Sequence, residues 1–249
     1  MNLMIRENDE DVFGQIFLDF YENKGPFHYF MERDDGLLQH RLSETYFQDF
    51  NKWNNEEQNL IQTIFENNFS SVLDIGAGAG RTSLYLQNKD IDVVALDASK
   101  GAIEVCQSRG IKKVFHSDIF NYQNSHSFDC LLLLGNNLAI GGDYDGTKNL
   151  LNKCKELIKS DGQILLHFLS PTPTQNTDHL KYHDLNKAQG KRIGEITTRI
   201  RYRTFASSWL KLFLPTEIEF EEIINTTQLK ILKNWSVNEN SFYIQLANE

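Results

Sequence analysis

A glycine-rich turn constrains this chain more than any other feature of its sequence. Residues 71–75 form a short apolar segment that predicts a buried strand, and residues 81–87 are typical of a helix. Between them, Gly76, Gly78 and Gly80 alternate with alanines. Glycine permits positive φ and close approach of the backbone to a ligand, and the first turn of a helix presents unbonded N–H groups. The segment therefore predicts a ligand-binding turn at the carboxyl end of a strand.

Strand-like and helix-like segments alternate after this turn. Further strands are expected near residues 91–96, 114–116, 128–134 and 163–168, with helical patterns between most of them. This alternation predicts right-handed crossovers and a parallel sheet covered by helices on both faces, which is an α/β doubly wound fold. Two last segments, near 229–237 and 241–246, are close enough in sequence to pair antiparallel at one edge.

The region before the turn has a different pattern. Apolar residues recur at helical spacing over residues 9–22, and a turn is expected at 33–36. We expect residues 1–69 to form an N-terminal helical cap or lid. Residues 70–249 would then form the ligand-binding domain.

A second departure from the alternation follows the fifth strand. Pro171 and Pro173 mark a loop, and residues 196–203 then alternate between apolar and polar like a half-exposed strand. Residues 209–213 are a candidate partner for that strand. An inserted β element is therefore expected at about 170–212.

Three acids follow three successive strands of the predicted sheet. Asp74 precedes the first glycine by two residues, where it would repel a pyrophosphate but suit a cationic amino group. Asp97 lies 23 residues further on, the usual place for a carboxylate that binds the hydroxyls of a ribose. Asp118 could accept a hydrogen bond from an adenine amine, with Ile119 against the ring. Together they predict an adenosine-type site at one edge of the sheet.

This set of motifs resembles class I S-adenosylmethionine-dependent methyltransferases over about residues 70–246, less closely after residue 170. The matching segments read DIGAGAGR, VVALDAS, HSDIF, FDCLLLLGN and KSDGQILL. The resemblance implies a Rossmann-like sheet of seven mostly parallel strands in the order 3-2-1-4-5-7-6, with strand seven antiparallel. It also implies S-adenosyl-L-methionine as cofactor and S-adenosyl-L-homocysteine as product.

The residues that the resemblance assigns to the cofactor lie at the ends of successive strands. They are Asp74, Gly76 and Gly78 at the methionine end, Gly80 in the same turn, Asp97 and Ala98 at the ribose, Asp118 and Ile119 at the adenine, and Gly135 after strand four. Two residues have an open alternative: Asp118 could cap a helix, and Arg81 could either steer a carboxylate or stay solvated. Tyr46, in the expected lid, would place an aromatic ring against the cofactor.

Candidates for acceptor chemistry follow strands four and five. Asn136 and Asn137 stand in a Leu-Gly-Asn segment similar to one in small-molecule N-methyltransferases, so we assign Asn136 to substrate binding and Asn137 to catalysis. His167 is the candidate general base, although a hydrogen-bonded core histidine is an equal alternative. Asp129 begins strand four and is interpreted as structural. The chain lacks the Asn/Asp-Pro-Pro-Tyr segment of enzymes that methylate nucleobase or glutamine amides.

Arginines share one face of the inserted strand. Arg199, Arg201 and Arg203 would form a positive patch, and Arg199 and Arg201 could select an anionic acceptor. The alternative is a solvated face balanced by the glutamates of residues 217–222. Tyr202 could line an acceptor pocket or pack in the core. His179 and His183 would reach the acceptor if the loop before the strand folds over it; these alternatives stay open.

Composition excludes several classes of function. The net charge of −9 disfavours a nucleic-acid binder, and no apolar run is long enough to span a membrane. Acidic residues near the start argue against a signal peptide, and three cysteines without a CxxC pair favour a reducing cytoplasm and no metal site. We therefore expect a cytoplasmic methyltransferase acting on a small molecule. The alternatives are a non-catalytic binding module of the same fold and a nicotinamide-dependent oxidoreductase.

Overall fold

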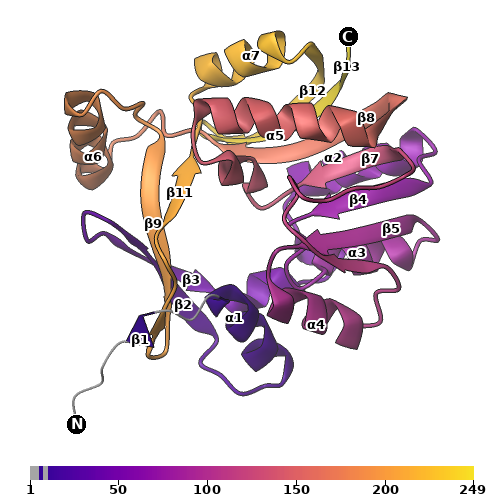
Figure 1. Ribbon diagram of the computed structural model, residues 1–249, viewed down its shortest axis with the longest axis horizontal. Coiled ribbons are helices and arrows are strands. Elements are labelled where there is room, and N and C mark those ends of the chain that lie inside the picture. The colour runs from indigo at the N-terminus through magenta and orange to yellow at the C-terminus, as the bar shows by residue number, and fades with distance from the viewer. Residues whose placement is uncertain (1–5, 8–10) are drawn as a thin grey trace.

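The computed structural model describes residues 6–7 and 11–249, and its main body is built on a seven-stranded sheet (Figure 1). Its strands are β4 (Ser71–Ile75), β5 (Asp92–Asp97), β6 (Val114–His116), β7 (Phe128–Leu133), β8 (Ile158–Leu169), β12 (Leu229–Asn238) and β13 (Ser241–Asn248). They lie in the order β12-β13-β8-β7-β4-β5-β6, and every pair is parallel except those of β13, which is antiparallel to both neighbours. The expected order 3-2-1-4-5-7-6 is confirmed.

Helices cover both faces of this sheet because its central strands present apolar side chains to both faces. The helices are α2 (Asn55–Glu66), α3 (Arg81–Gln87), α4 (Lys100–Ser108), α5 (Tyr144–Leu157) and α7 (Glu217–Thr226). One core joins α5 and α7 to Leu73, Leu131 and Ile164, and the other joins α2 to the neighbouring positions Val72 and Leu165. The doubly wound α/β class is therefore confirmed. None of the helices in the described part of the chain has both the length and the apolar character of a membrane-spanning segment.

A second, smaller sheet combines the N-terminal region with the insert. Its strands are β1 (Arg6–Glu7), β2 (His28–Arg33), β3 (Leu38–Leu42), β9 (Glu195–Tyr202), β10 (Phe205–Ala206) and β11 (Leu210–Phe213). The order is β1-β10-β9-β2-β3, and β11 pairs with the free part of β9, as the expected pairing of residues 209–213 requires. The β2–β3 hairpin turns at Asp34–Gly36, and β2 lies antiparallel to β9. Two segments far apart in sequence thus form one structural unit.

The N-terminal region differs from the helical cap expected over residues 1–69. It contains α1 (Val12–Tyr21), two short 3-10 helices, η1 (Ser43–Phe47) and η2 (Phe50–Lys52), and α2, but also the β2–β3 hairpin. The hairpin was not foreseen because its strand partner β9 is supplied by the distant insert. Of the helix expected over residues 9–22, residues 9 and 10 lie outside the described part.

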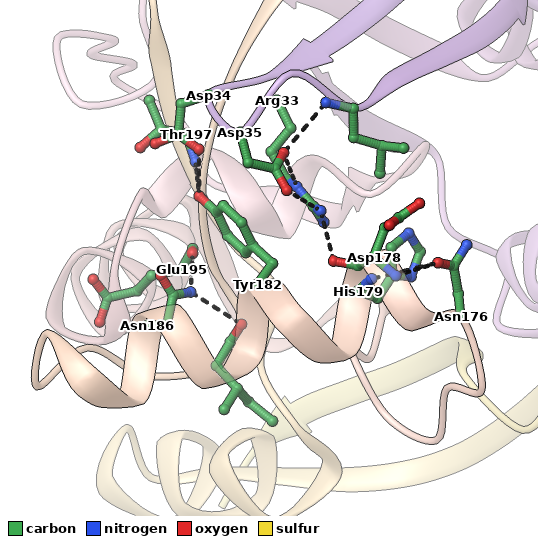
Figure 2. Close-up of polar contacts among 12 residues, drawn as sticks. Arg33, Asp34, Asp35, Asn176, Asp178, His179, Tyr182, Asn186, Glu195 and Thr197 are labelled. Atoms are coloured by element: carbon green, nitrogen blue, oxygen red, sulfur yellow. Dashed lines mark hydrogen bonds and ion pairs between the residues drawn. The ribbon is translucent and has the colours of Figure 1, made fainter.

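The loop expected after Pro173 contains a further helix, α6 (Thr177–Ala188), which contacts the tip of the hairpin (Figure 2). The Arg33 guanidinium lies 4.1 Å from the Tyr182 ring centroid and donates to the Asp178 carbonyl oxygen at 2.9 Å. The Tyr182 hydroxyl donates to Asp34 at 2.8 Å. The helix begins at an Asn176 cap, but its apolar residues do not gather on one face, so the periodicity of the sequence does not predict it. His179 and His183 lie on α6, where burial lowers the pKa of each imidazole.

Asp129 joins the amino ends of β4 and β7, far from the glycine turn. Its Oδ2 accepts the backbone N–H groups of Ser70 and Ser71 at 2.8 and 2.9 Å, and its Oδ1 accepts from Lys159 Nζ at 2.5 Å. Burial acts to raise the pKa of Asp129, but these hydrogen bonds outweigh it and hold the pKa well below its usual range. This geometry agrees with the structural interpretation of Asp129.

The Asp129→Asn substitution is therefore expected to lower the free energy of unfolding by about 1–3 kcal/mol at neutral pH. Because the folded-state pKa is depressed, this contribution is complete above the ordinary aspartate pKa of about 4 and is lost as pH falls below it. Urea unfolding at pH 7 and about pH 3 should show that the free energies of unfolding of wild type and variant differ less at the lower pH. An equal difference in free energy of unfolding at both pH values would contradict the assignment. The exposed Asp161→Asn variant is the control.

Candidate cofactor site

The glycine turn lies where β4 ends and α3 begins, and its backbone excludes side chains. Gly76 has φ +69°, and a Cβ there would lie 2.4 Å from Asn137 Nδ2. Gly80 caps α3 in the left-handed conformation, with φ +73°, and a Cβ there would lie 2.2 Å from Ile111 Cδ1. Any larger residue would strain the backbone and displace a neighbour at both positions. The turn therefore requires the glycines that the sequence provides.

Asp97 ends β5 beside this turn. Its Oδ2 accepts the Gly78 backbone N–H at 2.8 Å, and its Oδ1 accepts that of Ser99 at 2.8 Å. Burial raises the pKa of Asp97, while the two N–H donors act to lower it. Ala98 is exposed next to it. The structure thus brings Asp97 and the glycine turn together, with the carboxylate fixed in orientation and further lone pairs available to a ligand.

The next two strand ends provide the rest of the predicted adenosine site. Asp118 is exposed after β6, and its Oδ1 accepts the Phe120 backbone N–H at 2.7 Å. A turn follows it, so the alternative of a helix cap is wrong. Ile119 is buried beside it. Gly135, after β7, is exposed, and a Cβ there would meet nothing within 4 Å. These residues form an open edge that fits an adenosine-type cofactor.

Asp74 lies beneath the turn rather than on its surface. Its side chain is buried, and Oδ2 accepts from the Ser83 hydroxyl of α3 at 2.6 Å. Burial raises the pKa of Asp74 to about 6. The observed contact gives Asp74 a role in holding the turn against α3; the contact with the methionine end stays a prediction.

Arg81 is not solvated, and its predicted contact with a cofactor carboxylate stays a prediction. It forms an ion pair with Glu57 of α2, and its guanidinium lies 4.3 Å from the Trp53 ring centroid. Glu57 is only 5% exposed, and burial raises the pKa of its carboxyl against the opposing effect of Arg81. The pair joins α3, the helix that begins at the turn, to the N-terminal region. A solvated Arg81 is therefore excluded.

An aromatic cluster from the N-terminal region lies on the turn. A Cβ at Gly78 would be 3.6 Å from both Phe17 of α1 and Tyr46 of η1. The Tyr46 hydroxyl is 2.8 Å from that of Tyr29 on β2, and the ring packs 4.8 Å from that of Phe17. Tyr46 therefore lies at the turn, as expected of a lid aromatic. Sequence reasoning missed Phe17 and Tyr29, although the helical spacing of the first was visible.

The two asparagines after β7 bind backbone atoms of neighbouring strands. Asn136 Oδ1 accepts the Leu169 N–H at 3.0 Å. Asn137 Nδ2 donates to the carbonyl oxygens of Ile75 and Gly76 at 2.8 and 3.0 Å. These bonds hold the ends of β4, β7 and β8 in place. They favour a positioning role for both residues over the substrate and catalytic roles predicted for them.

His167 lies near the end of β8 on the face shared with α2. Its ring stacks on Tyr243 at 4.5 Å, and Nε2 is 3.1 Å from the Ser241 hydroxyl. Nδ1 is buried without a hydrogen-bond partner among the described residues. Burial lowers the pKa of His167 to about 4, so the imidazole is neutral at pH 7. A neutral imidazole can accept a proton, and its role as base stays a prediction.

Arg199 and Arg201 of β9, and Arg203 just after it, have acidic partners other than those expected. Arg199 Nε lies 2.7 Å from Glu32, and Arg201 Nε lies 3.5 Å from the same carboxylate. Arg203 pairs with Asp19 of α1 at 2.8 Å. The balancing acids therefore come from the N-terminal region and not from residues 217–222, where Glu219 pairs with Arg192.

Tyr202 is a core residue of the smaller sheet. Its side chain is 2% exposed, and its hydroxyl donates to Asp19 at 2.9 Å. Of the two readings left open by the sequence, core packing is the one observed. Tyr202 is therefore not a wall of an acceptor pocket.

Comparison with known proteins identifies the domain around the turn. Residues 72–162 match the family model described as a methyltransferase domain. None of the curated proteins matches the chain. Among solved structures, a SAM-dependent methyltransferase from Bacteroides fragilis in complex with S-adenosyl-L-homocysteine has a TM-score of 0.76 and 21% identity, over 96% of this chain and 95% of that one.

Two further solved structures share the fold at lower similarity. A S-adenosylmethionine-dependent methyltransferase from Clostridium acetobutylicum has a TM-score of 0.60 and 17% identity, over 81% of this chain and 92% of that one. The third is a 1,6-didemethyltoxoflavin-N1-methyltransferase from Burkholderia thailandensis with bound 1,6-didemethyltoxoflavin and S-adenosylhomocysteine. It has a TM-score of 0.54 and 14% identity, over 78% of this chain and 79% of that one. Residues 72–162 therefore match a methyltransferase domain, and the chain as a whole shares the fold of these solved S-adenosylmethionine-dependent methyltransferases.

Proposed function

We propose that this enzyme transfers the methyl group of S-adenosyl-L-methionine to a small-molecule acceptor and releases S-adenosyl-L-homocysteine. The observation that carries the proposal is the cover over the glycine turn. Phe17 and Tyr46 lie 3.6 Å from where a Cβ on Gly78 would be, and the Tyr46 hydroxyl is 2.8 Å from that of Tyr29 of the smaller sheet. Protein lies against the cofactor turn on this side, which leaves little room for a macromolecular acceptor and suits a small one.

The chain's own residues supply binding and orientation. When bound, the cofactor provides a methyl group on a sulfonium, which is displaced in line by the acceptor. Asp97 would hold the ribose hydroxyls, Asp118 and Ile119 the adenine, and the turn at Gly76 and Gly78 the methionine end. The aromatic cover would exclude water and hold the acceptor in line, which is the main contribution of a protein to this reaction.

The solved neighbours and the cysteines support the finer parts of the proposal. The Burkholderia neighbour has 1,6-didemethyltoxoflavin bound, which agrees with a small-molecule acceptor for this chain. An amine acceptor would need to arrive neutral, whereas a hydroxyl would need a base, for which His167 remains the candidate. Cys106, Cys130 and Cys154 are free and buried, which agrees with a reducing cytoplasmic location.

Transfer of label from methyl-labelled S-adenosylmethionine tests this function. The purified enzyme would be incubated with a metabolite extract, with protein and with nucleic acid in separate reactions. We expect label in the small-molecule fraction only, and less of it with the Asp97→Ala variant. Label in protein or nucleic acid would contradict the proposed acceptor class. Cofactor binding without transfer to any fraction would instead support a non-catalytic binding module.

A further inference from the structure

One face of the β2–β3 hairpin contacts the aromatic cluster that lies on the glycine turn, and the same face carries the cation Arg41. Arg41 of β3 stands directly opposite Tyr29 of β2 in the antiparallel register. Opposed residues of an antiparallel pair project from the same face of a sheet. Tyr29 is 3% exposed on that face, and its hydroxyl is 2.8 Å from that of Tyr46, whose ring lies 3.6 Å from where a Cβ on Gly78 would be. Two contacts therefore connect the position of Arg41 to the glycine turn.

Arg41 keeps its charge available, unlike most arginines of this chain. Its guanidinium donates to Gln39 Oε1 at 2.7 Å and to the His40 carbonyl oxygen at 3.1 Å. Among the described residues, no carboxylate forms an ion pair with it. In contrast, ion pairs with carboxylates are formed by Arg33, Arg81, Arg192, Arg199, Arg201 and Arg203. Arg41 is thus an exposed cation that neutral groups hold in place.

Electrostatics agree with this placement. Burial raises the pKa of both Tyr29 and Tyr46, and the positive charge of Arg41 acts to lower both. Asp97, the predicted ribose ligand, acts on Tyr46 in the opposite sense. The Tyr29 hydroxyl therefore lies within the field of Arg41, and the Tyr46 hydroxyl lies within the fields of both Arg41 and Asp97.

We propose that Arg41 binds a carboxylate of the acceptor and determines specificity for acceptors that carry one. A guanidinium presents paired N–H donors that match the two oxygens of a carboxylate, and Gln39 orients it. The inference rests on the proposed transfer to a small molecule. It assigns anion selection to Arg41 of β3 in place of Arg199 and Arg201, which form ion pairs with Glu32.

The test uses the label-transfer reaction with a metabolite extract. The labelled product should be retained on an anion exchanger at about pH 11, above the ordinary pKa of amines. Retention should disappear after esterification in acidic methanol, which blocks carboxylates. Arg41→Leu should reduce formation of this product on the order of 10- to 100-fold, with S-adenosylhomocysteine affinity and thermal unfolding unchanged. Arg41→Lys should retain part of the activity, because it keeps the charge but loses the paired donors.

The control is His40→Ala, on the neighbouring residue of the same strand, whose side chain projects from the opposite face. It should leave product formation unchanged. A product that is not retained, retention that survives esterification, or full activity of Arg41→Leu would each overturn the inference. Absence of any labelled small molecule would instead overturn the proposed function, so the two failures are distinguishable.

Discussion

Replacing Arg81 with methionine is expected to lower the free energy of unfolding by about 3–5 kcal/mol. The substitution leaves Glu57, which is 5% exposed, without its cation, and an unpaired buried carboxylate is costly. It also removes the guanidinium that lies over Trp53. Urea unfolding followed by circular dichroism measures the loss directly.

Two companion variants separate charge from packing at Arg81. The Arg81→Lys variant keeps the positive charge but loses the planar group over Trp53, so it should lose less than Arg81→Met. The double variant Glu57→Gln with Arg81→Met removes both charges and should recover much of the stability lost. If Arg81→Met were as stable as wild type, the contact between α2 and α3 would not stabilise the fold.

Replacing Asp97 with alanine is expected to weaken binding of S-adenosylhomocysteine by about 10- to 100-fold, from the loss of about 1–3 kcal/mol of hydrogen bonding. The carboxylate would no longer accept the ribose hydroxyls. It would also release the N–H groups of Gly78 and Ser99, which it orients in the absence of ligand. Isothermal titration calorimetry provides the affinities.

The matched control for Asp97 is Asp92→Ala at the other end of the same strand. Asp92 is exposed, and its carboxylate pairs with Lys113 at 2.7 Å. Exposed pairs of this kind contribute little to stability, so cofactor affinity should match wild type. Equal affinities for Asp97→Ala and wild type would show that the ribose assignment is wrong.

Local features made much of the fold and cofactor site predictable. The turn at Gly76 and Gly80 is defined by residues next to one another, and the positions of Asp97 and Asp118 follow from where strands end. Residues at the carboxyl ends of parallel strands share one edge of a sheet, so these acids could be placed together without a structure.

Long-range pairing limited the prediction of the acceptor side. The partner of Arg81 lies 24 residues away, and Glu32 lies 167 residues from Arg199; no spacing rule connects either pair. The strand pattern of β9 was visible, but not that β2 would pair with it. The availability of Arg41 follows only once the partners of the other arginines are known.

Calorimetric titration of the wild-type enzyme tests the central claim most directly. The adenosine-type site on Asp97, Asp118 and the glycine turn predicts saturable binding of S-adenosylhomocysteine at one site per chain. The spacing of the glycines predicts no binding of a nicotinamide dinucleotide under the same conditions. Binding of the dinucleotide without binding of S-adenosylhomocysteine would contradict the account.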